Sequence, residues 1–343
     1  MTGPTRLFLE ITTECNLHCR LCHLWANTDS PAKLATAEKI TFLTDLADWL
    51  QDVQNIDSRN FSIVFTGGEP FLYKDEILAL ASTCQELGFC SFVNSNGTLL
   101  GPIIPDIVRS GLTAITISLD SYLVPIHDDL RGVPGTFSRA THNVQGMLRE
   151  KAEIGSHINV FLQSILGKWN IGEIEAQVRW AETLGVAGIM FQCLQYPFGL
   201  PIPSEWQMNF PDFPSLDAVD NAIQTALMLK TEGAPIVNSE EEILWWRTYF
   251  ANPEFFPSGF SPCMAGAQNL IIDILGNAKF CFNKMITPPD RVGNIRTRNL
   301  SELWEGPSAM DVKGEMAQCH RSCGVMVCHC DSSIRESAPL GGN

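Results

Sequence analysis

Long apolar runs, clusters of basic residues and a targeting segment are all missing from this sequence. No apolar run approaches the roughly 18–20 residues that a helix needs to cross a bilayer. Lysine and arginine total 23 against 38 aspartates and glutamates, which gives a formal net charge of −15, and no window is rich in basic residues. We therefore predict a chain that binds neither a membrane nor nucleic acid.

The N-terminus lacks the features of a signal or transit peptide. Residues 1–15 contain one basic residue, two glutamates and no long apolar core. This predicts a cytoplasmic protein whose thiols stay reduced. The chain has 12 cysteines, and in that compartment they favour metal binding over disulfides.

Short β-like segments alternate with amphipathic segments through the first two thirds of the chain. The predicted strands are 6–12, 60–66, 89–95, 112–120, 157–166 and 187–195. The predicted helices are 37–53, 74–87, 103–110, 136–152, 171–184 and 216–230. Such α/β alternation predicts a parallel sheet with right-handed crossovers, either a partly closed barrel or an open doubly wound sheet.

One face of several predicted strands is polar. In 112–120, Ile115 and Ile117 alternate with Thr116 and Ser118. Buried parallel strands are usually apolar on both faces, so this alternation favours a barrel whose interior holds a polar ligand. A packed interior with a few hydrogen-bonded hydroxyls is the alternative.

The composition changes near residue 232, where loop-rich segments begin. We predict a barrel domain at 1–232, a small cysteine-rich domain at 233–335 and a flexible tail at 336–343. No internal repeat stands out.

Three cysteines follow the first predicted strand in the stretch CNLHCRLC. Cys15, Cys19 and Cys22 have the spacing C-x3-C-x2-C, on the kind of loop that carries catalytic groups in βα barrels. Iron–sulfur cubes normally take four thiolates, so three would leave one iron open to another ligand. The alternative is a Cys3His zinc site with His18 or His23.

This motif resembles that of the radical S-adenosylmethionine (SAM) enzymes. The resemblance implies a partial (β/α)6 TIM-type barrel with Cys15, Cys19 and Cys22 as ligands of a [4Fe-4S] cluster and with SAM on the open iron. It also implies an external electron donor such as flavodoxin or ferredoxin. The expected chemistry is reductive SAM cleavage to a 5′-deoxyadenosyl radical, which abstracts a substrate hydrogen atom.

A second motif ends the second predicted strand. Gly67, Gly68, Glu69 and Pro70 match the GGEP-type motif of the same family. In that family the motif contacts the SAM amino group, so the resemblance implies the same role here.

Weaker resemblances extend the match over about residues 6–200. The stretch 94–100 resembles the family's TNG-type segment, and 118–121 with 127–137 resembles its S-[IL]-D-G and HD–RG–GF segments. By resemblance, Ser118 and Arg139 are candidates for binding the SAM carboxylate. A solvated helix face is the alternative for Arg139.

Six cysteines lie in the last third of the chain. Cys263, Gly276 and Cys281 form C-x12-G-x4-C, which resembles the opening hairpin of SPASM or twitch extensions that bind auxiliary iron–sulfur clusters. The resemblance implies at least one auxiliary [4Fe-4S] cluster, held by Cys263, Cys281 and two of the last four cysteines. A second cluster, or a zinc site with His320 and His329, is the alternative. The last four cysteines are Cys319, Cys323, Cys328 and Cys330.

The remaining cysteines are predicted to be small buried core residues. Cys84 falls in a predicted helix, and Cys90 starts a predicted strand. Cys193 should point toward the helices if Gln192 faces the interior. His127 is either a loop base or a structural polar residue.

The expected function is modification of a ribosomally made peptide, because such extensions are most often met in that branch. A dehydrogenase or epimerase of an aminocyclitol or sugar-like metabolite is the alternative within the enzyme class, and a zinc-binding scaffold is the alternative outside it. Only 14 residues precede Cys15, so we expect no fused leader-binding domain and a separate leader-recognition protein or direct docking.

Overall fold

In the computed structural model, residues 3–29, 32–197, 200–253, 264–282 and 290–319 are described. A sheet forms the centre of the molecule, in the strand order β6-β5-β4-β3-β2-β1-β7-β8, and its strands are parallel except for β8. The strands are β1 (Arg6–Thr12), β2 (Ser62–Gly67), β3 (Cys90–Ser95), β4 (Ala114–Ser118), β5 (Asn159–Leu166), β6 (Gly188–Cys193), β7 (Asn269–Ile272) and β8 (Ala278–Lys279). This order confirms the prediction of a partial barrel.

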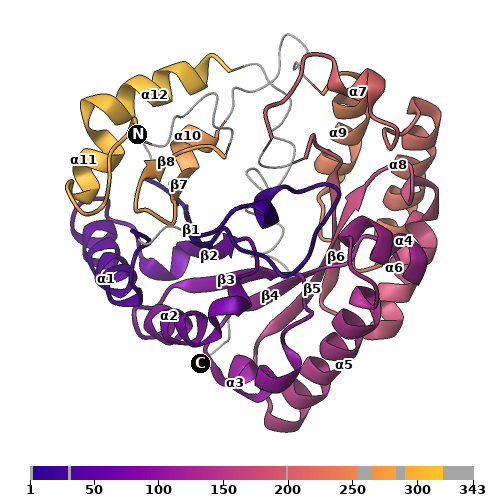
Figure 1. Cartoon of the computed structure of the whole chain (residues 1–343), viewed down its shortest axis with the longest axis horizontal. Helices are drawn as coiled ribbons and strands as arrows, with labels where there is room; N and C mark the ends of the chain where they lie inside the picture. The colour runs from indigo at the N-terminus through magenta and orange to yellow at the C-terminus, as the bar shows by residue number, and fades with distance from the viewer. Residues whose placement is uncertain (1–2, 30–31, 198–199, 254–263, 283–289, 320–343) are drawn as a thin grey trace.

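Helices cover the outer face of the strands, as Figure 1 shows. The α-helices are α1 (Thr36–Asp52), α2 (Lys74–Glu86), α3 (Ile104–Arg109), α4 (Val124–Arg131), α5 (Thr136–Ile154), α6 (Ile174–Leu184), α7 (Trp206–Asn209), α8 (Leu216–Thr231), α9 (Glu240–Ala251), α10 (Ala265–Gln268), α11 (Leu300–Glu305) and α12 (Pro307–Ala317). Short 3-10 helices are η1 (Leu24–Ala26), η2 (Ser58–Asn60), η3 (Pro70–Tyr73), η4 (Gly101–Ile103) and η5 (Ile171–Glu173). No helix in the described ranges is both long and apolar enough to cross a membrane.

The two faces of the sheet bury different side chains. Ile115 and Ile117 pack in the large core between the strands and the helices, as the alternation predicts. On the inner face a separate apolar cluster includes Phe8, Phe92 and Phe161. An apolar layer therefore crosses the middle of the interior, with polar side chains toward the carboxyl ends of the strands and the buried residues Arg6, Ser62 and Asn269 at their amino ends.

The C-terminal region extends the sheet at the β1 edge. β7 pairs in parallel with β1 and in antiparallel with β8. The predicted hairpin is confirmed, and Asp273 closes it by accepting hydrogen bonds from the backbone N–H groups of Leu275 and Asn277, both at 2.9 Å. The pairing with β1 was not predicted. α11 lies beside α1, where the Trp49 indole donates to Ser301 Oγ at 2.9 Å.

Residues after 232 also cover the other edge of the barrel. Ile236 forms a parallel bridge with Ile189 of β6. The Asn238 side chain hydrogen-bonds both the N–H and the carbonyl group of Phe191, at 2.7 and 3.0 Å. Residues after 232 therefore contact both edge strands of the barrel, β1 and β6. The domain boundary at 232/233 stays a prediction.

Candidate active site

The three cysteines of the first motif lie together on the loop after β1. Cys15, Cys19 and Cys22 are half-buried and form no disulfide. Burial raises the pKa of Cys15 to about 11, and the neighbouring Glu69, Cys19 and Cys22 add to the rise. Burial, followed by Cys19, also raises the pKa of Cys22. Three thiolates in this place would need positive charge to balance them, as the iron ions of a cluster provide.

The GGEP motif is packed against the start of the cysteine loop. Gly68 N–H donates to Thr12 O at 2.7 Å, and Glu69 N–H donates to Glu14 O at 2.9 Å. The end of β2 thereby holds the backbone that leads into Cys15. The close approach made by the glycines is to this backbone of the chain itself.

Glu69 is buried, and its carboxylate is engaged within the protein. It accepts hydrogen bonds from Ser95 Oγ at 2.8 Å, Asn96 N–H at 2.8 Å and Phe71 N–H at 3.1 Å. Burial raises the pKa of Glu69 in spite of these donors. Its visible role is to join the ends of β2 and β3.

Asn96 connects the end of β3 to the cysteine loop. Its Nδ2 lies 4.0 Å from Cys15 Sγ and donates to Asn16 Oδ1 at 2.9 Å. Thr98 completes the contact, since its hydroxyl donates to Asn96 Oδ1 at 2.6 Å. The sequence marked this stretch as part of the site but did not single out Asn96.

Arg131, at the end of α4, is a second residue that sequence reasoning missed. One guanidinium nitrogen lies 3.9 Å from Cys19 Sγ, and another lies 2.8 Å from Asp120 Oδ2. The only sequence signal was its place in the HD–RG segment.

Polar side chains line the interior between the apolar layer and the carboxyl ends of the strands. Gln163 and Gln192 hydrogen-bond through their amides, and Ser118 pairs in register with Gln163. All three side chains are half-buried. Because Gln192 faces inward, Cys193 packs in the outer core as predicted.

Arg139 and His127 lie in different environments. Arg139 is exposed in the first turn of α5. His127 is buried, and its Nδ1 accepts a hydrogen bond from Asp120 N–H at 3.2 Å. Burial and then Arg131 lower the pKa of His127 to about 4, so this histidine is a neutral structural residue.

Two of the three scattered cysteines are buried as predicted. Cys84 and Cys193 are in the core. The prediction for Cys90 is only partly confirmed, because Cys90 starts β3 and packs against the inner apolar cluster but is half-buried.

The auxiliary site is only partly described. Cys281 follows β8 and Cys319 follows α12, and both are half-buried. Among the described residues, no three histidine, cysteine, aspartate or glutamate side chains are arranged to hold a single metal ion. A [4Fe-4S] cube binds each thiolate at a different iron, so its ligands need not converge on one point. The other predicted ligands lie outside the described residues: Cys263, Cys323, Cys328 and Cys330.

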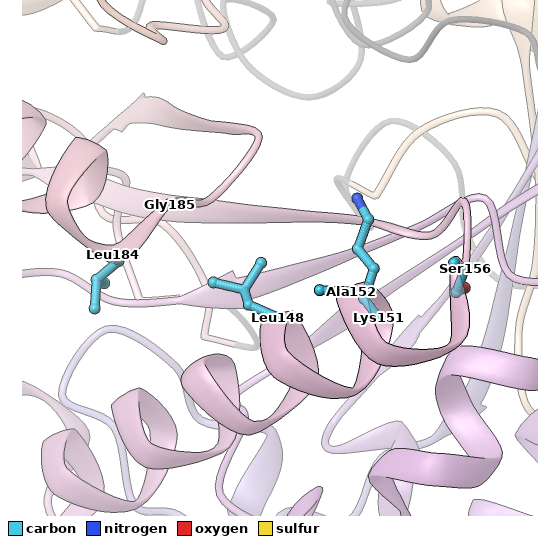
Figure 2. A pocket seen from close by; sticks show the side chains of 7 residues that line it. Leu148, Lys151, Ala152, Ser156, Leu184 and Gly185 are labelled. Atoms are coloured by element: carbon cyan, nitrogen blue, oxygen red, sulfur yellow. The ribbon is translucent and has the colours of Figure 1, made fainter.

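A shallow pocket of about 460 Å³ lies between the C-terminal ends of α5 and α6, and Figure 2 shows Lys151 at it. These helix ends lead into the amino ends of β5 and β6. The pocket is therefore at the opposite end of the parallel sheet from the cysteine loop.

Two family models match this chain. The radical SAM superfamily model matches residues 9–165, and an iron–sulfur cluster-binding domain, SPASM, matches residues 263–331. The chain belongs to the radical SAM superfamily and carries a SPASM-type extension. It is an enzyme of that superfamily.

Similar curated proteins act in different pathways. An AdoMet-dependent heme synthase of Methanosarcina barkeri is 25% identical over 337 residues, which cover 95% of this chain and 89% of the relative. The heme synthase of Oleidesulfovibrio alaskensis is 33% identical over 138 residues, 40% of this chain and 33% of the relative. The subtilosin biosynthesis protein AlbA of Bacillus subtilis is 27% identical over 178 residues, 51% of this chain and 37% of its own length.

A solved structure shares the fold. Streptococcus suis SuiB bound to its precursor peptide SuiA superimposes with a TM-score of 0.68 at 16% identity, covering 95% of this chain and 73% of SuiB. At this identity the likeness supports the fold and not a common substrate.

Proposed function

We propose that Cys15, Cys19 and Cys22 hold a [4Fe-4S] cluster whose fourth iron binds SAM. The observation that carries this proposal is that the GGEP segment packs on the backbone leading into Cys15 and that Arg131 contacts Cys19, at the carboxyl ends of the strands. When bound and reduced by an external donor such as flavodoxin or ferredoxin, the cluster and SAM supply a 5′-deoxyadenosyl radical that removes a hydrogen atom from substrate.

The residues of this chain have separate roles in the proposal. The segments after β2 and β3 hold the cysteine loop. The apolar layer that includes Phe8 and Phe92 separates this part of the interior from the amino ends of the strands. Exclusion of water there protects a reactive intermediate. Ser118 and Arg139 remain candidates for the SAM carboxylate. Because the Glu69 carboxylate is engaged, GGEP would contact the SAM amino group through its backbone.

We favour a ribosomally made peptide as the substrate. The amides of Gln163 and Gln192 form a neutral pair on the inner face, and amide donors and acceptors match a peptide backbone. The similarity to AlbA, a bacteriocin biosynthesis protein, agrees with this choice.

A tetrapyrrole is the second candidate substrate. The observation that favours it is the match to the Methanosarcina barkeri heme synthase, which extends over 95% of this chain. Tetrapyrroles absorb strongly in the visible range, so binding can be measured directly. Tight binding of a tetrapyrrole with no turnover of any peptide would support this candidate over the first.

The test of the cluster assignment is anaerobic reconstitution followed by an assay for 5′-deoxyadenosine. We expect brown protein that cleaves SAM, and we expect the triple variant Cys15→Ala, Cys19→Ala, Cys22→Ala to lose cleavage while auxiliary iron remains. The matched control is Cys84→Ala, a buried cysteine in α2, which should keep all its iron. Undiminished 5′-deoxyadenosine production by the triple variant would refute the assignment.

A further inference from the structure

The C-terminus of α4 is docked on the cysteine loop. The carbonyl group of Arg131 accepts the N–H of His18 at 3.2 Å, and the carbonyl group of Leu130 accepts the N–H of Arg20 at 2.9 Å. These two N–H groups flank Cys19 in the sequence. The end of α4 therefore fixes the backbone on both sides of this cysteine.

The junction after the helix is equally tight. A Cβ atom at Gly132 would lie 2.3 Å from the carbonyl oxygen of His18, and Gly132 has a φ of +69°. Only glycine fits this position without moving the loop. The geometry of the helix end and the course of the cysteine loop are thus set together.

The Arg131 side chain reaches the same cysteine and leaves one donor over. The Arg131 side chain is 12% exposed, and its guanidinium is held by Asp120, whose side chain is 3% exposed. Its Nε atom is buried and has no hydrogen-bond partner in the described part of the chain. A buried donor without a partner is costly, which indicates a ligand that the described residues do not themselves supply.

The positive charge of Arg131 lies next to the cysteine loop. One guanidinium nitrogen is 3.9 Å from Cys19 Sγ, and the partner of another, Asp120, is itself buried. Arg131 is a buried cation at the centre of the site.

We propose that Arg131 is a positioning residue that orients the Cys19 thiolate and, through its buried positive charge, raises the midpoint potential of the radical-generating cluster. This inference rests on the proposed function, because it requires a cluster at Cys15, Cys19 and Cys22. One-electron reduction by the external donor adds one negative charge to the cluster. A cation held nearby in a region of low dielectric constant favours that more negative state, and Asp120 partly offsets it.

The test is a redox titration of the reconstituted full-length protein, followed by electron paramagnetic resonance. In Arg131→Met the midpoint potential of the radical cluster should become more negative, while the auxiliary cluster in the same sample stays unchanged. Arg131→Lys keeps the positive charge, so its midpoint potential should lie closer to that of the wild type. Arg149→Met, which removes an exposed arginine of α5, is the matched control and should change neither cluster.

Asp120→Asn tests the direction of the shift in midpoint potential. It removes the offsetting negative charge but keeps the oxygen that accepts Ile165 N–H, so the potential should become less negative. A purely structural role would not move the two variants in opposite directions. If Arg131→Met loses its radical cluster, the Asp120→Asn variant still tests the proposal. An unchanged or more negative midpoint potential in Asp120→Asn overturns the proposal.

Failure of this inference differs from failure of the proposed function. If the triple cysteine variant keeps its full iron content and SAM cleavage, the proposed function itself fails. If the cluster is present but neither Arg131→Met nor Asp120→Asn shifts its potential, only the role of Arg131 is wrong.

Discussion

Gly68 lies against the carbonyl oxygen of Glu14 so closely that no side chain fits between them. A Cβ atom at position 68 would be 1.9 Å from that oxygen, and one at Gly67 would be 2.2 Å from Thr12 O. Both contacts are with the backbone that leads into Cys15. The motif that resembles a cofactor-binding segment thus also packs the cysteine loop onto β2.

The first prediction is that Gly68→Ala weakens the cysteine loop. The added methyl group must displace backbone, which we expect to cost at least about 1–3 kcal/mol of unfolding free energy and to reduce iron retention at the radical cluster. Denaturant unfolding of the apoprotein and iron content after reconstitution are the measurements.

Gly314→Ala is the control for this prediction. Gly314 is inside α12, and a Cβ there would meet nothing within 4 Å. Alanine in a helix is favoured over glycine by about 1 kcal/mol, so this variant should be neutral or more stable. Equal iron retention in the two variants would contradict the packing role of Gly68.

The second prediction concerns His127 and acid pH. Its pKa is about 4 in the folded protein against a normal value of 6.5. As pH falls from 6.5 to 4, the unfolded chain takes up a proton that the folded protein excludes. Stability should therefore fall in this window, by at most about 1.4 kcal/mol per pH unit.

His127→Phe removes this titration while filling the same buried space. Its unfolding free energy should depend less on pH between 6.5 and 4 than that of the wild type. His142→Phe, at an exposed position of α5, should keep the wild-type dependence. The same slope in the wild type and His127→Phe would show that His127 is not held neutral.

The third prediction concerns the buried ion pair between Lys39 of α1 and Glu76 of α2. Lys39 is fully buried, and burial lowers its pKa in spite of Glu76. Lys39→Met alone leaves a carboxylate of low exposure without its partner, and we expect a loss of about 3–5 kcal/mol. The double variant Lys39→Met, Glu76→Leu should recover most of it in denaturant unfolding. If the double variant is as unstable as Lys39→Met, the unpaired Glu76 carboxylate is not the cause of the loss in stability.

Periodicity was sufficient to predict the barrel strands and the helices α1, α2, α3, α5, α6 and α8, because their core positions repeat at regular intervals. It could not predict that β7 pairs with β1, since the apolar residues of 269–272 indicate burial but no partner. α4 was missed because its eight residues have few apolar positions. α9, α11 and α12 were missed because they lie in the region that was predicted to be rich in loops.

The cysteines proposed as cluster ligands could be singled out from their spacing and from the family resemblance, whereas the residues around them could not. Asn96 and Arg131 reach the cysteine loop from segments that are distant in the sequence. Their roles depend on how three loops meet at the ends of the strands. No local pattern records such a meeting, although both residues lie within segments that the resemblance marked.

The last prediction is that Asn96→Asp impairs cluster binding more than Asn96→Ala does. Asn96 Nδ2 donates to Asn16 and lies 4.0 Å from Cys15 Sγ, while its Oδ1 accepts from Thr98. Aspartate keeps the acceptor but replaces the donor with a negative charge beside a thiolate, which is repulsive. Alanine only removes the contacts.

The measurement is the rate at which a chelator strips iron from the radical cluster, read against the auxiliary cluster in the same sample. Asn221→Asp makes the same change at an exposed position of α8 and should leave the rate unchanged. Faster loss from Asn96→Ala than from Asn96→Asp would mean that the contact to Thr98, and not the donor facing Cys15, is what holds the loop.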